Sequence, residues 1–332
     1  MFFITIVIPC RNEEKIIGKC LDSILAQDYS RDRMEVLVVD GASVDGTRVV
    51  VDGFVQRNFF IRILDNPRKI ASFALNKGIN EAKGEVVIRM DAHAQYPSDY
   101  VSKCVKYLNE YAVDNVGGVC LTLPGAETLK AKAITLALST PFGVGNSYFR
   151  IGTKEPKIVD TVPFGCYRRG VFERIGNFNE NLVRNQDIEF NLRLKKAGGK
   201  ILLVPDIKSY YYARDNFRDL FRNNFENGFW VIYGMKFAKL PFSLRHLAPF
   251  SLVSLLILSA ALLAVNQNFI FVFYLILGLY LLLNIVMSLS IAFKKGISYF
   301  LFVALSFFIL HFSYGLGSIC GLARLILPEG KK

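Results

Sequence analysis

The sequence predicts an α/β domain built on a mostly parallel, doubly wound sheet, followed by a membrane-embedded helical tail. Three observations support this fold class. Apolar runs alternate with amphipathic stretches as far as residue 139, and uncharged apolar runs of 20 or more residues follow residue 245. In addition, 52% of the 332 residues are hydrophobic, which exceeds the usual share in a soluble domain.

Five buried strands are expected, each followed by a helix. The strands cover 2–9, 34–40, 60–64, 85–91 and 116–123, and the helices cover 12–27, 45–57, 70–82, 97–111 and 127–139. The apolar runs are continuous rather than alternating, which indicates strands buried on both faces. Strands that alternate with helices favour a parallel sheet, in which ligands bind beyond the carboxyl ends of the strands. Residues 182–206 predict a further helix, a glycine pair and a strand.

Charge and cysteine content narrow the function classes. The chain has 40 Lys and Arg against 28 Asp and Glu, and the net charge of +12 suits nucleic acid or an anionic membrane face. The basic residues gather beside the apolar runs and no nucleic-acid recognition module is visible, so we expect a membrane and no nucleic acid. The six cysteines form no CxxC pair, which indicates neither a zinc site nor disulfides and favours a reducing cytoplasm.

Three apolar runs, at 246–265, 268–293 and 299–323, are expected to cross a membrane. Each is long enough for a hydrocarbon core of about 30 Å. Arg245 precedes the first run and Lys294–Lys295 lie between the second and third. The positive-inside rule therefore predicts a multi-pass protein of the cell (inner or plasma) membrane with a cytoplasmic N-terminal domain and a tail over 246–332. The third run has a glycine-rich second half, so it is either a simple span or a re-entrant segment.

Residues 214–245 are expected to form an interfacial helix region. Aromatic residues recur every four positions from Phe217 to Phe237, and Arg214, Arg218 and Arg222 form a neighbouring stripe. Such a stripe is also typical of a helix that faces a protein core. Its place immediately before a membrane span favours aromatics at the acyl boundary and arginines at lipid phosphates.

Acidic residues stand at the ends of two predicted strands. Asp40 opens the turn "DGASVDGT", in which Asp45 or Thr47 can cap the next helix. A strand-to-helix turn with a capping acid is one interpretation, and a nucleotide site is the other. The turn contains neither GxxxxGK[ST] nor GxGxxG, so neither a P-loop nor a dinucleotide-binding fold is supported.

Asp91 and His93 follow the strand at 85–91 and are separated by one residue. An oxygen and an imidazole nitrogen suit Mn²⁺ or Mg²⁺ held together with a diphosphate. The alternative is that Asp91 caps the helix beginning near Pro97 and that His93 faces solvent. Asp187 lies in the first turn of the helix expected in 182–206, where an acid complements the helix dipole or acts as a general base.

Five motifs in order resemble those of the inverting family-2 glycosyltransferases. They read "VIPCRNEEKIIGKCLDSILAQ", "EVLVVDGASVDGT", "ALNKGINEAKGEVVIRMDAH", "VPFGCYRRGVFERIG" and "NQDIEFNLRLKKAGG". The chain is most similar to the membrane-anchored succinoglycan-biosynthesis branch, in which the metal triplet reads DAH, and the resemblance spans residues 4 to 235. It implies a GT-A (Rossmann-like) fold over 1–213, a role in polysaccharide biosynthesis, a nucleotide-diphospho-sugar donor and a divalent cation, Mn²⁺ or Mg²⁺.

The resemblance also implies roles for individual residues. Asp187 would be the base that deprotonates the acceptor hydroxyl, and Asp91 and His93 would hold the metal and diphosphate. The donor-binding residues would be Pro9, Arg11, Glu13, Asp40, Lys69 and Asp91. The sequence departs from the family pattern at "VDGA", where a second acid is missing, and at Gln186, where an acid usually precedes the base.

The leading hypothesis is a membrane-bound enzyme that transfers a sugar, with a UDP-sugar expected as donor, to a polyprenyl-phosphate- or diphosphate-linked acceptor with inversion. A processive polysaccharide synthase of the same fold is a second interpretation, but "FENGFW" keeps only Trp230 of the polymer-holding motif of such synthases. A catalytically inactive membrane scaffold is the third. The acids Asp40, Asp91 and Asp187 argue against it, because a scaffold does not need all three.

Overall fold

The computed structural model describes residues 1–238 and 244–327. Residues 239–243 of the predicted 214–245 region and residues 328–332 of the predicted tail lie outside these described residues. Contacts divide the chain into two compact units. Unit 1 holds Met1–Leu121 and Tyr148–Tyr212, and unit 2 holds Thr122–Ser147 and Ala213–Lys332.

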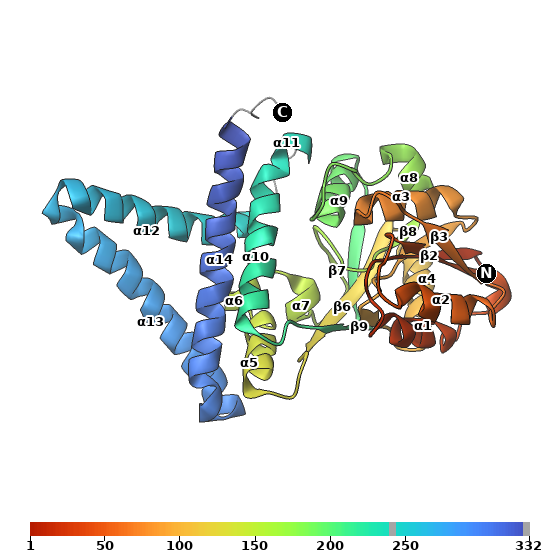
Figure 1. Cartoon of the computed structure of the whole chain (residues 1–332), viewed down its shortest axis with the longest axis horizontal. Coiled ribbons are helices and arrows are strands. Elements are labelled where there is room, and N and C mark those ends of the chain that lie inside the picture. Colours follow the sequence, from red (N-terminus) through yellow and green to blue (C-terminus); the bar gives the residue numbers. More distant parts are fainter. Residues whose placement is uncertain (239–243, 328–332) are drawn as a thin grey trace. The chain divides into compact units, whose positions relative to one another are not determined.

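Unit 1 contains a sheet whose first four strands run parallel (Figure 1). The strand order is β3-β2-β1-β4-β8-β6-β9-β5, and β7 pairs with β9. The parallel strands are β1 (Ile4–Cys10), β2 (Met34–Asp40), β3 (Ile61–Asp65) and β4 (Val86–Arg89). All seven residues of β2 are buried, as the unbroken apolar run predicts. The parallel arrangement of the predicted strands is confirmed for these four.

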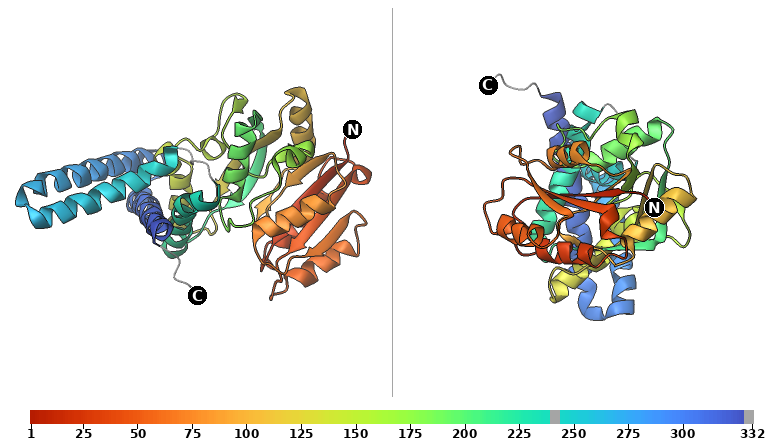
Figure 2. Two further views of the ribbon diagram at one scale, coloured as in Figure 1. Left: turned by 90° about the horizontal axis from the view of Figure 1, so that it is seen from above. Right: turned by 90° about the vertical axis from the view of Figure 1, so that its right-hand side faces the viewer.

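Helices cover both faces of the parallel strands, which confirms the doubly wound prediction; Figure 2 shows both layers. The helices are α1 (Ile17–Leu25), α2 (Thr47–Val55), α3 (Ala71–Glu81), α4 (Tyr100–Glu110), α8 (Gly170–Ile175) and α9 (Gln186–Lys196). Ile6 and Ile8 share one apolar core with α1, α2 and α4, whereas Val7 shares a second core with α3, α8 and α9. Successive side chains of a strand point to opposite faces, so one strand serves both cores.

The rest of the sheet is added by antiparallel pairs. β8 (Cys166–Arg168) pairs antiparallel with both β4 and β6 (Asn115–Leu123), and β9 (Ile201–Tyr212) does so with β5 (Ala94–Gln95) and β7 (Lys157–Ile158). The two- and three-residue strands are too short for a hydrophobic period to reveal them. The sequence therefore predicts the four parallel strands together with β6 and β9, and it misses the short strands β5, β7 and β8. The strand predicted at 116–123 exists as β6 but pairs antiparallel with β8.

Unit 2 is helical. It contains α5 (Leu129–Leu138), α6 (Pro141–Val144), α10 (Phe217–Tyr233), α11 (Met235–Ala238), α12 (Leu247–Val265), α13 (Ile270–Lys295) and α14 (Phe300–Ile326). The last three are long and apolar enough to cross a membrane, with mean hydropathies of 2.3, 2.6 and 1.8. The three predicted apolar runs are therefore helices, and the third is one continuous helix rather than an interrupted segment.

Helices α10 and α14 lie side by side in unit 2, at a distance set by glycine (Figure 1). A Cβ atom on Gly317 of α14 would lie 2.0 Å from the carbonyl oxygen of Phe225 on α10, and one on Gly321 would lie 2.5 Å from that of Phe229. The hydroxyl of Ser318 donates to the carbonyl of Gly228 at 3.2 Å. Small residues of this kind let two helix backbones approach closely.

The buried face of α10 is not its aromatic stripe. Its buried residues are Leu220, Gly228, Val231 and Ile232, while Phe221 remains 41% exposed. Phe217, Phe225, Phe229, Tyr233 and Phe237 are half-buried, and the ring of Phe217 stacks on Phe302 of α14 with centroids 6.5 Å apart. The core-facing interpretation of the stripe therefore stays a prediction, and so does the interfacial role of this helix.

Helix α5 packs against α14 through a small apolar cluster. Ala133, Ile134 and Ala137 of α5 share this cluster with Val303 and Phe307 of α14. Segment 122–147 therefore belongs to the same compact unit as the C-terminal helices. The sequence instead predicts it as part of a single domain over 1–213. The linear division at residues 213 and 245 stays a prediction.

Candidate active site

The pocket at the carboxyl ends of β1 and β4 gathers most of the residues that the sequence singles out. Its volume is about 290 Å³. The predicted site residues Pro9, Arg11, Glu13, Lys69, Asp91 and His93 all line it, together with Arg89 and Gln186. This volume lies just below the roughly 300–1,000 Å³ that is typical of small-molecule sites. Asp40 and Asp187 do not line it, but Asp40 precedes the lining residue Gly41, and Asp187 pairs with the lining residue Arg89.

Asp40 ends β2 and is held by its own turn. Its carboxylate accepts from the amide of Ser43 at 3.3 Å and from the hydroxyl of Ser43 at 2.6 Å. Arg48 Nη1 lies 3.7 Å from Oδ2 of Asp40 and also pairs with Asp65. Helix α2 begins at Thr47 after Gly46, and Asp45 accepts from the amide of Thr47 at 3.1 Å in the turn before it. The neighbour of Asp40, Gly41, lines the pocket, and contact of Asp40 itself with a nucleoside stays a prediction.

Asp91 is held by a salt bridge rather than by a helix N-terminus. Its Oδ1 accepts from Nε of Arg89 at 3.2 Å and from Nη2 at 3.1 Å, and its Oδ2 lies 3.3 Å from Nη2. Helix α4 begins at Tyr100, after Asp99. The alternative in which Asp91 caps this helix is therefore wrong.

His93 faces the same pocket from the loop between β4 and β5. Its Nδ1 lies 3.3 Å from Oε1 of Glu13, and its ring packs edge-on against Tyr211 with centroids 5.9 Å apart. The guanidinium of Arg150 lies 5.2 Å from the centroid of the same tyrosine ring. The imidazole is thus oriented by a carboxylate and an aromatic ring, and 40% of the side chain is exposed.

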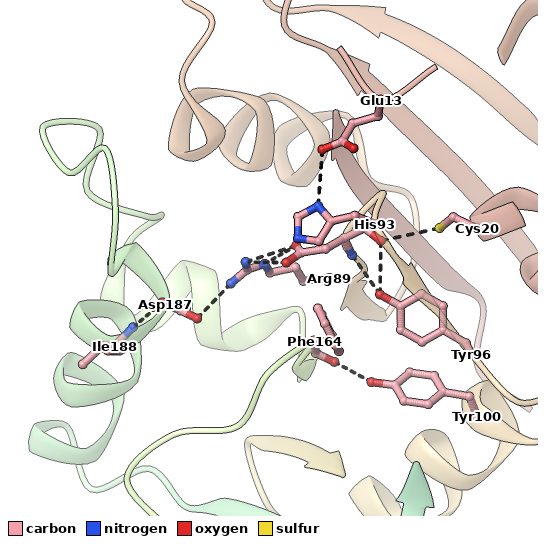
Figure 3. A network of polar contacts seen from close by, with 10 residues as sticks. Glu13, Cys20, Arg89, His93, Tyr96, Tyr100, Phe164, Asp187 and Ile188 are labelled. Carbon is pink, nitrogen blue, oxygen red and sulfur yellow. Dashed lines mark hydrogen bonds and ion pairs between the residues drawn. The ribbon is translucent and has the colours of Figure 1, made fainter. Parts of the chain in front are cut away.

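Arg89 contacts both Asp91 and Asp187, and Figure 3 shows its contact with Asp187. While Nε and Nη2 hold Asp91, Nη1 lies 3.2 Å from Oδ2 of Asp187. The Arg89 side chain is only 12% exposed. Burial alone lowers the pKa of this guanidinium, but the charges of Asp91 and Asp187 outweigh burial and raise it. A permanent positive charge therefore lies between two carboxylates.

Asp187 lies in the first turn of α9, which confirms the helix predicted for this segment. The residue before the helix, Asn185, adopts a left-handed conformation with φ of 60°. Oδ1 of Asp187 accepts from the amide of Ile188 at 2.9 Å, while Oδ2 faces Arg89. The Asp187 side chain is 29% exposed, so it combines a fixed direction with access to a substrate.

Left-handed backbone positions gather around this pocket. Lys69, which lines it, has φ of 62°, and Asn12 and Ala42, which follow the lining residues Arg11 and Gly41, have φ of 56° and 53°. Such conformations cost roughly 1 kcal/mol or more in residues other than glycine, and they concentrate at functional sites.

Cys10 also lines the pocket, but its thiol is unreactive near neutral pH. Burial, followed by the charges of Asp40 and Glu13, raises the pKa of its thiol to about 12. A thiol with this pKa carries almost no thiolate near neutral pH, and the thiolate is the reactive form. The site therefore holds carboxylates and cations, and it holds no activated cysteine nucleophile at Cys10.

The donor set fits a divalent cation that takes part of its coordination from a bound diphosphate. Carboxylate oxygen and imidazole nitrogen are acceptable ligands for Mn²⁺, and both side chains face one pocket that Lys69 and Arg11 also line. Among residues 1–238 and 244–327, no group of three or more His, Cys, Asp or Glu side chains is placed to hold a metal alone. Such a cation must also compete with Arg89 for Asp91.

Comparison with known proteins gives a consistent picture. A family model described as "Glycosyl transferase family 2" matches residues 5–176. The chain is 31% identical over 265 residues to a dolichyl N-acetyl-alpha-D-glucosaminyl phosphate 3-beta-D-2,3-diacetamido-2,3-dideoxy-beta-D-glucuronosyltransferase of Methanococcus voltae, which covers 77% of this chain and 81% of that protein. It is 30% identical to the succinoglycan biosynthesis protein ExoA of Rhizobium meliloti, over 78% and 76% of the two chains.

A solved structure supports the fold. The mannosyltransferase PcManGT from Pyrobaculum calidifontis, in complex with GDP-Man and Mn²⁺, is similar with a TM-score of 0.63 at 20% identity. The match covers 97% of this chain and 88% of that one. The predicted GT-A fold with C-terminal apolar helices is thus confirmed. Arg89 is the site residue to which sequence reasoning gave no role, and its signal was a basic side chain that follows the apolar run Val86–Ile88 in the strand expected at 85–91.

Proposed function

Because this chain belongs to glycosyl transferase family 2 and is a glycosyltransferase, we propose that it transfers one sugar from a nucleotide-diphospho-sugar to a lipid-linked acceptor, with inversion. One observation carries this proposal. Arg89 lies 3.1 Å from Asp91 and 3.2 Å from Asp187, so that the diphosphate side and the base side of one site are adjacent. A scaffold without activity has no need for this arrangement.

The acids and cations divide the reaction between them. The acceptor hydroxyl loses its proton to Oδ2 of Asp187 while its oxygen forms a bond to the anomeric carbon. The bond between that carbon and the diphosphate oxygen breaks, and its electron pair leaves with the diphosphate. Attack from the face opposite the leaving group inverts the anomeric centre.

Lys69 and Arg11 line the pocket and supply positive charge where the leaving diphosphate accumulates negative charge. Asp91 and His93 would hold a divalent cation, Mn²⁺ or Mg²⁺, which when bound neutralises diphosphate charge. Pro9, Glu13 and Asp40 would complete the donor side, with Glu13 orienting His93 through their 3.3 Å contact.

A polyprenyl-linked acceptor suits the C-terminal half. Three helices are apolar enough to cross a membrane, and the relative from Methanococcus voltae carries a dolichyl phosphate sugar in its name. Lys294 and Lys295 end α13, and Arg245 precedes α12, which supports a multi-pass arrangement with these ends and unit 1 in the cytoplasm. A sugar acceptor on a lipid then meets the enzyme at the cytoplasmic leaflet.

The test is direct transfer by the full chain in detergent or lipid, with Mn²⁺ and polyprenyl-linked acceptors. UDP-sugars are the first donors to screen and GDP-mannose the second, because the solved neighbour binds GDP-Man. We expect release of nucleoside diphosphate that depends on acceptor, with short products. Long polymers would favour the processive synthase instead.

Asp91→Ala should abolish donor-dependent turnover, and Asp187→Asn should lower it by about 10²–10⁴-fold without loss of donor binding. The control is Asp206→Asn, which removes an exposed acid of β9 that pairs with Lys103 at 2.8 Å, away from the pocket. Full activity in both site variants would refute the assigned roles.

A further inference from the structure

We infer that Arg89 is a positioning residue that couples cation binding at Asp91 to the placement of Asp187. The inference rests on the proposed function, because it presumes a cation at Asp91 and a base at Asp187. It concerns a residue to which neither the motifs nor the comparisons give a role. The geometry of one shared guanidinium carries it.

The guanidinium divides its donors between the two acids. Nε and Nη2 point to Oδ1 of Asp91 at 3.2 and 3.1 Å, and Nη1 points to Oδ2 of Asp187 at 3.2 Å. The planar fork of arginine can hold two carboxylates in fixed directions, whereas lysine offers one compact charge. Asp91 and Asp187 are far apart in sequence, and this one side chain contacts both.

The backbone of Arg89 is fixed, so only its side chain can adjust. It belongs to β4 in register with Val7 of β1, and its amide donates to the carbonyl of Gly165 at 3.0 Å. With a side chain only 12% exposed, the guanidinium has little contact with water. Charge-assisted hydrogen bonds are stronger in such surroundings, so a change at one carboxylate affects the other.

A cation at Asp91 competes with Arg89 for the same oxygens. When the cation takes them, Asp187 becomes the main carboxylate partner of the guanidinium, and the base is held more firmly. By linkage, Asp187 must then favour cation binding, because it draws Arg89 away from Asp91. If Asp187 is removed, Arg89 commits fully to Asp91 and the cation binds more weakly.

The experiment measures Mn²⁺ affinity rather than activity. The full-length protein in detergent is titrated with Mn²⁺ in the presence of UDP or GDP, and free Mn²⁺ is read by electron paramagnetic resonance. Four proteins form a cycle: the unchanged chain, Asp187→Ala, Arg89→Gln, and the double variant. Loss of the Asp187 charge weakens Mn²⁺ binding whether residue 89 is Arg or Gln. The difference between these two effects on the Kd isolates the coupling that Arg89 mediates.

Asp187→Ala should raise the Kd for Mn²⁺ in the Arg89 background and in the Arg89→Gln background. We expect the increase to be about fivefold larger in the Arg89 background, which is the lower end of typical coupling between two sites. Arg89→Lys keeps the charge and guards against a Gln variant that fails to fold. Because lysine lacks the fork, the lysine background should behave like the glutamine background. Arg62→Gln is the matched control, since Arg62 pairs with Glu35 at 3.2 Å outside the pocket, and it should leave the effect intact.

Each outcome has a distinct meaning. Equal shifts in the arginine, lysine and glutamine backgrounds would overturn the coupling and leave the transfer reaction untouched. If the unchanged chain binds no Mn²⁺ with either nucleotide, the cation site and the coupling both fall. Transfer assays without added metal then decide separately whether the enzyme activity stands.

Discussion

Gly317→Ala is a sharp test of the helix packing in unit 2. The added Cβ would lie 2.0 Å from the carbonyl oxygen of Phe225, 2.8 Å from its carbonyl carbon and 3.0 Å from its Cα. All three are backbone atoms of α10, which cannot rotate away as a side chain can. An ordinary contact between carbon and oxygen needs about 3.3 Å, so α10 and α14 must separate by about 1.3 Å at this point.

The cost follows from that separation. A gap of about 0.5–1 Å already forfeits a quarter to a half of the van der Waals attraction between facing atoms, and overpacking costs about 1–3 kcal/mol. The hydrogen bond from Ser318 to Gly228 adds about 0.6 kcal/mol if it is lost. Alanine returns up to about 1 kcal/mol through its better helix propensity. The net destabilisation is therefore about 0.6–2.6 kcal/mol, or roughly 1–5 °C in Tm for a chain of this size.

Thermal unfolding in one detergent, at one scan rate, is the assay. Gly278→Ala is the matched control, because Gly278 also lies inside an apolar helix, α13. Apart from its chain neighbours and the adjacent backbone of α13, no described atom lies within 4 Å of an added Cβ. We expect its Tm to stay the same or to rise by about 2 °C. Equal melting temperatures for the two variants would refute the close contact between α10 and α14.

Three further results are expected. Asp187→Asn should lower kcat by about 10²–10⁴-fold, the usual value of a general base, while Asp206→Asn leaves it unchanged in the same transfer assay. The pKa of Cys10 is raised to about 12, so this thiol should react with iodoacetamide at pH 8 about 10³-fold more slowly than a free thiol. The extent of modification should rise with pH and can be followed by mass spectrometry. Asn76→Ala should lower the free energy of unfolding by about 2–4 kcal/mol in denaturant titrations. The buried Asn76 side chain donates to the carbonyl of Phe178 and accepts from its amide, both at 2.9 Å. Unchanged stability would contradict this role.

The parallel half of the fold follows from the sequence because its strands are buried on both faces and read as unbroken apolar runs. The short antiparallel strands do not follow, since β8 has three residues and its place beside β4 depends on contacts distant in sequence. Likewise, the C-terminal apolar helices are predicted by their length and their lack of charged residues. The packing of α5 on α14 does not, because its small alanine surface gives little pattern.

For the site, the topology rule predicts that strand ends meet, and the structure places Glu13, Lys69, Asp91 and His93 in one pocket. Arg89 required a further step. Val87 and Arg89 share one face of β4 by alternation, and Val87 belongs to the core that α9 covers. Knowing which helix covers that face would have placed the arginine beside Asp187. That pairing is set by tertiary packing, which local pattern does not encode.

The cluster between α5 and α14 has a practical consequence for protein production. A chain cut before α12 to obtain a water-soluble enzyme would leave Ala133, Ile134 and Ala137 without Val303 and Phe307. Newly exposed apolar surface of this kind promotes aggregation. Removing the anchor would therefore carry a solubility penalty of its own, and polar replacements on α5 would be the first remedy when a shortened enzyme is expressed.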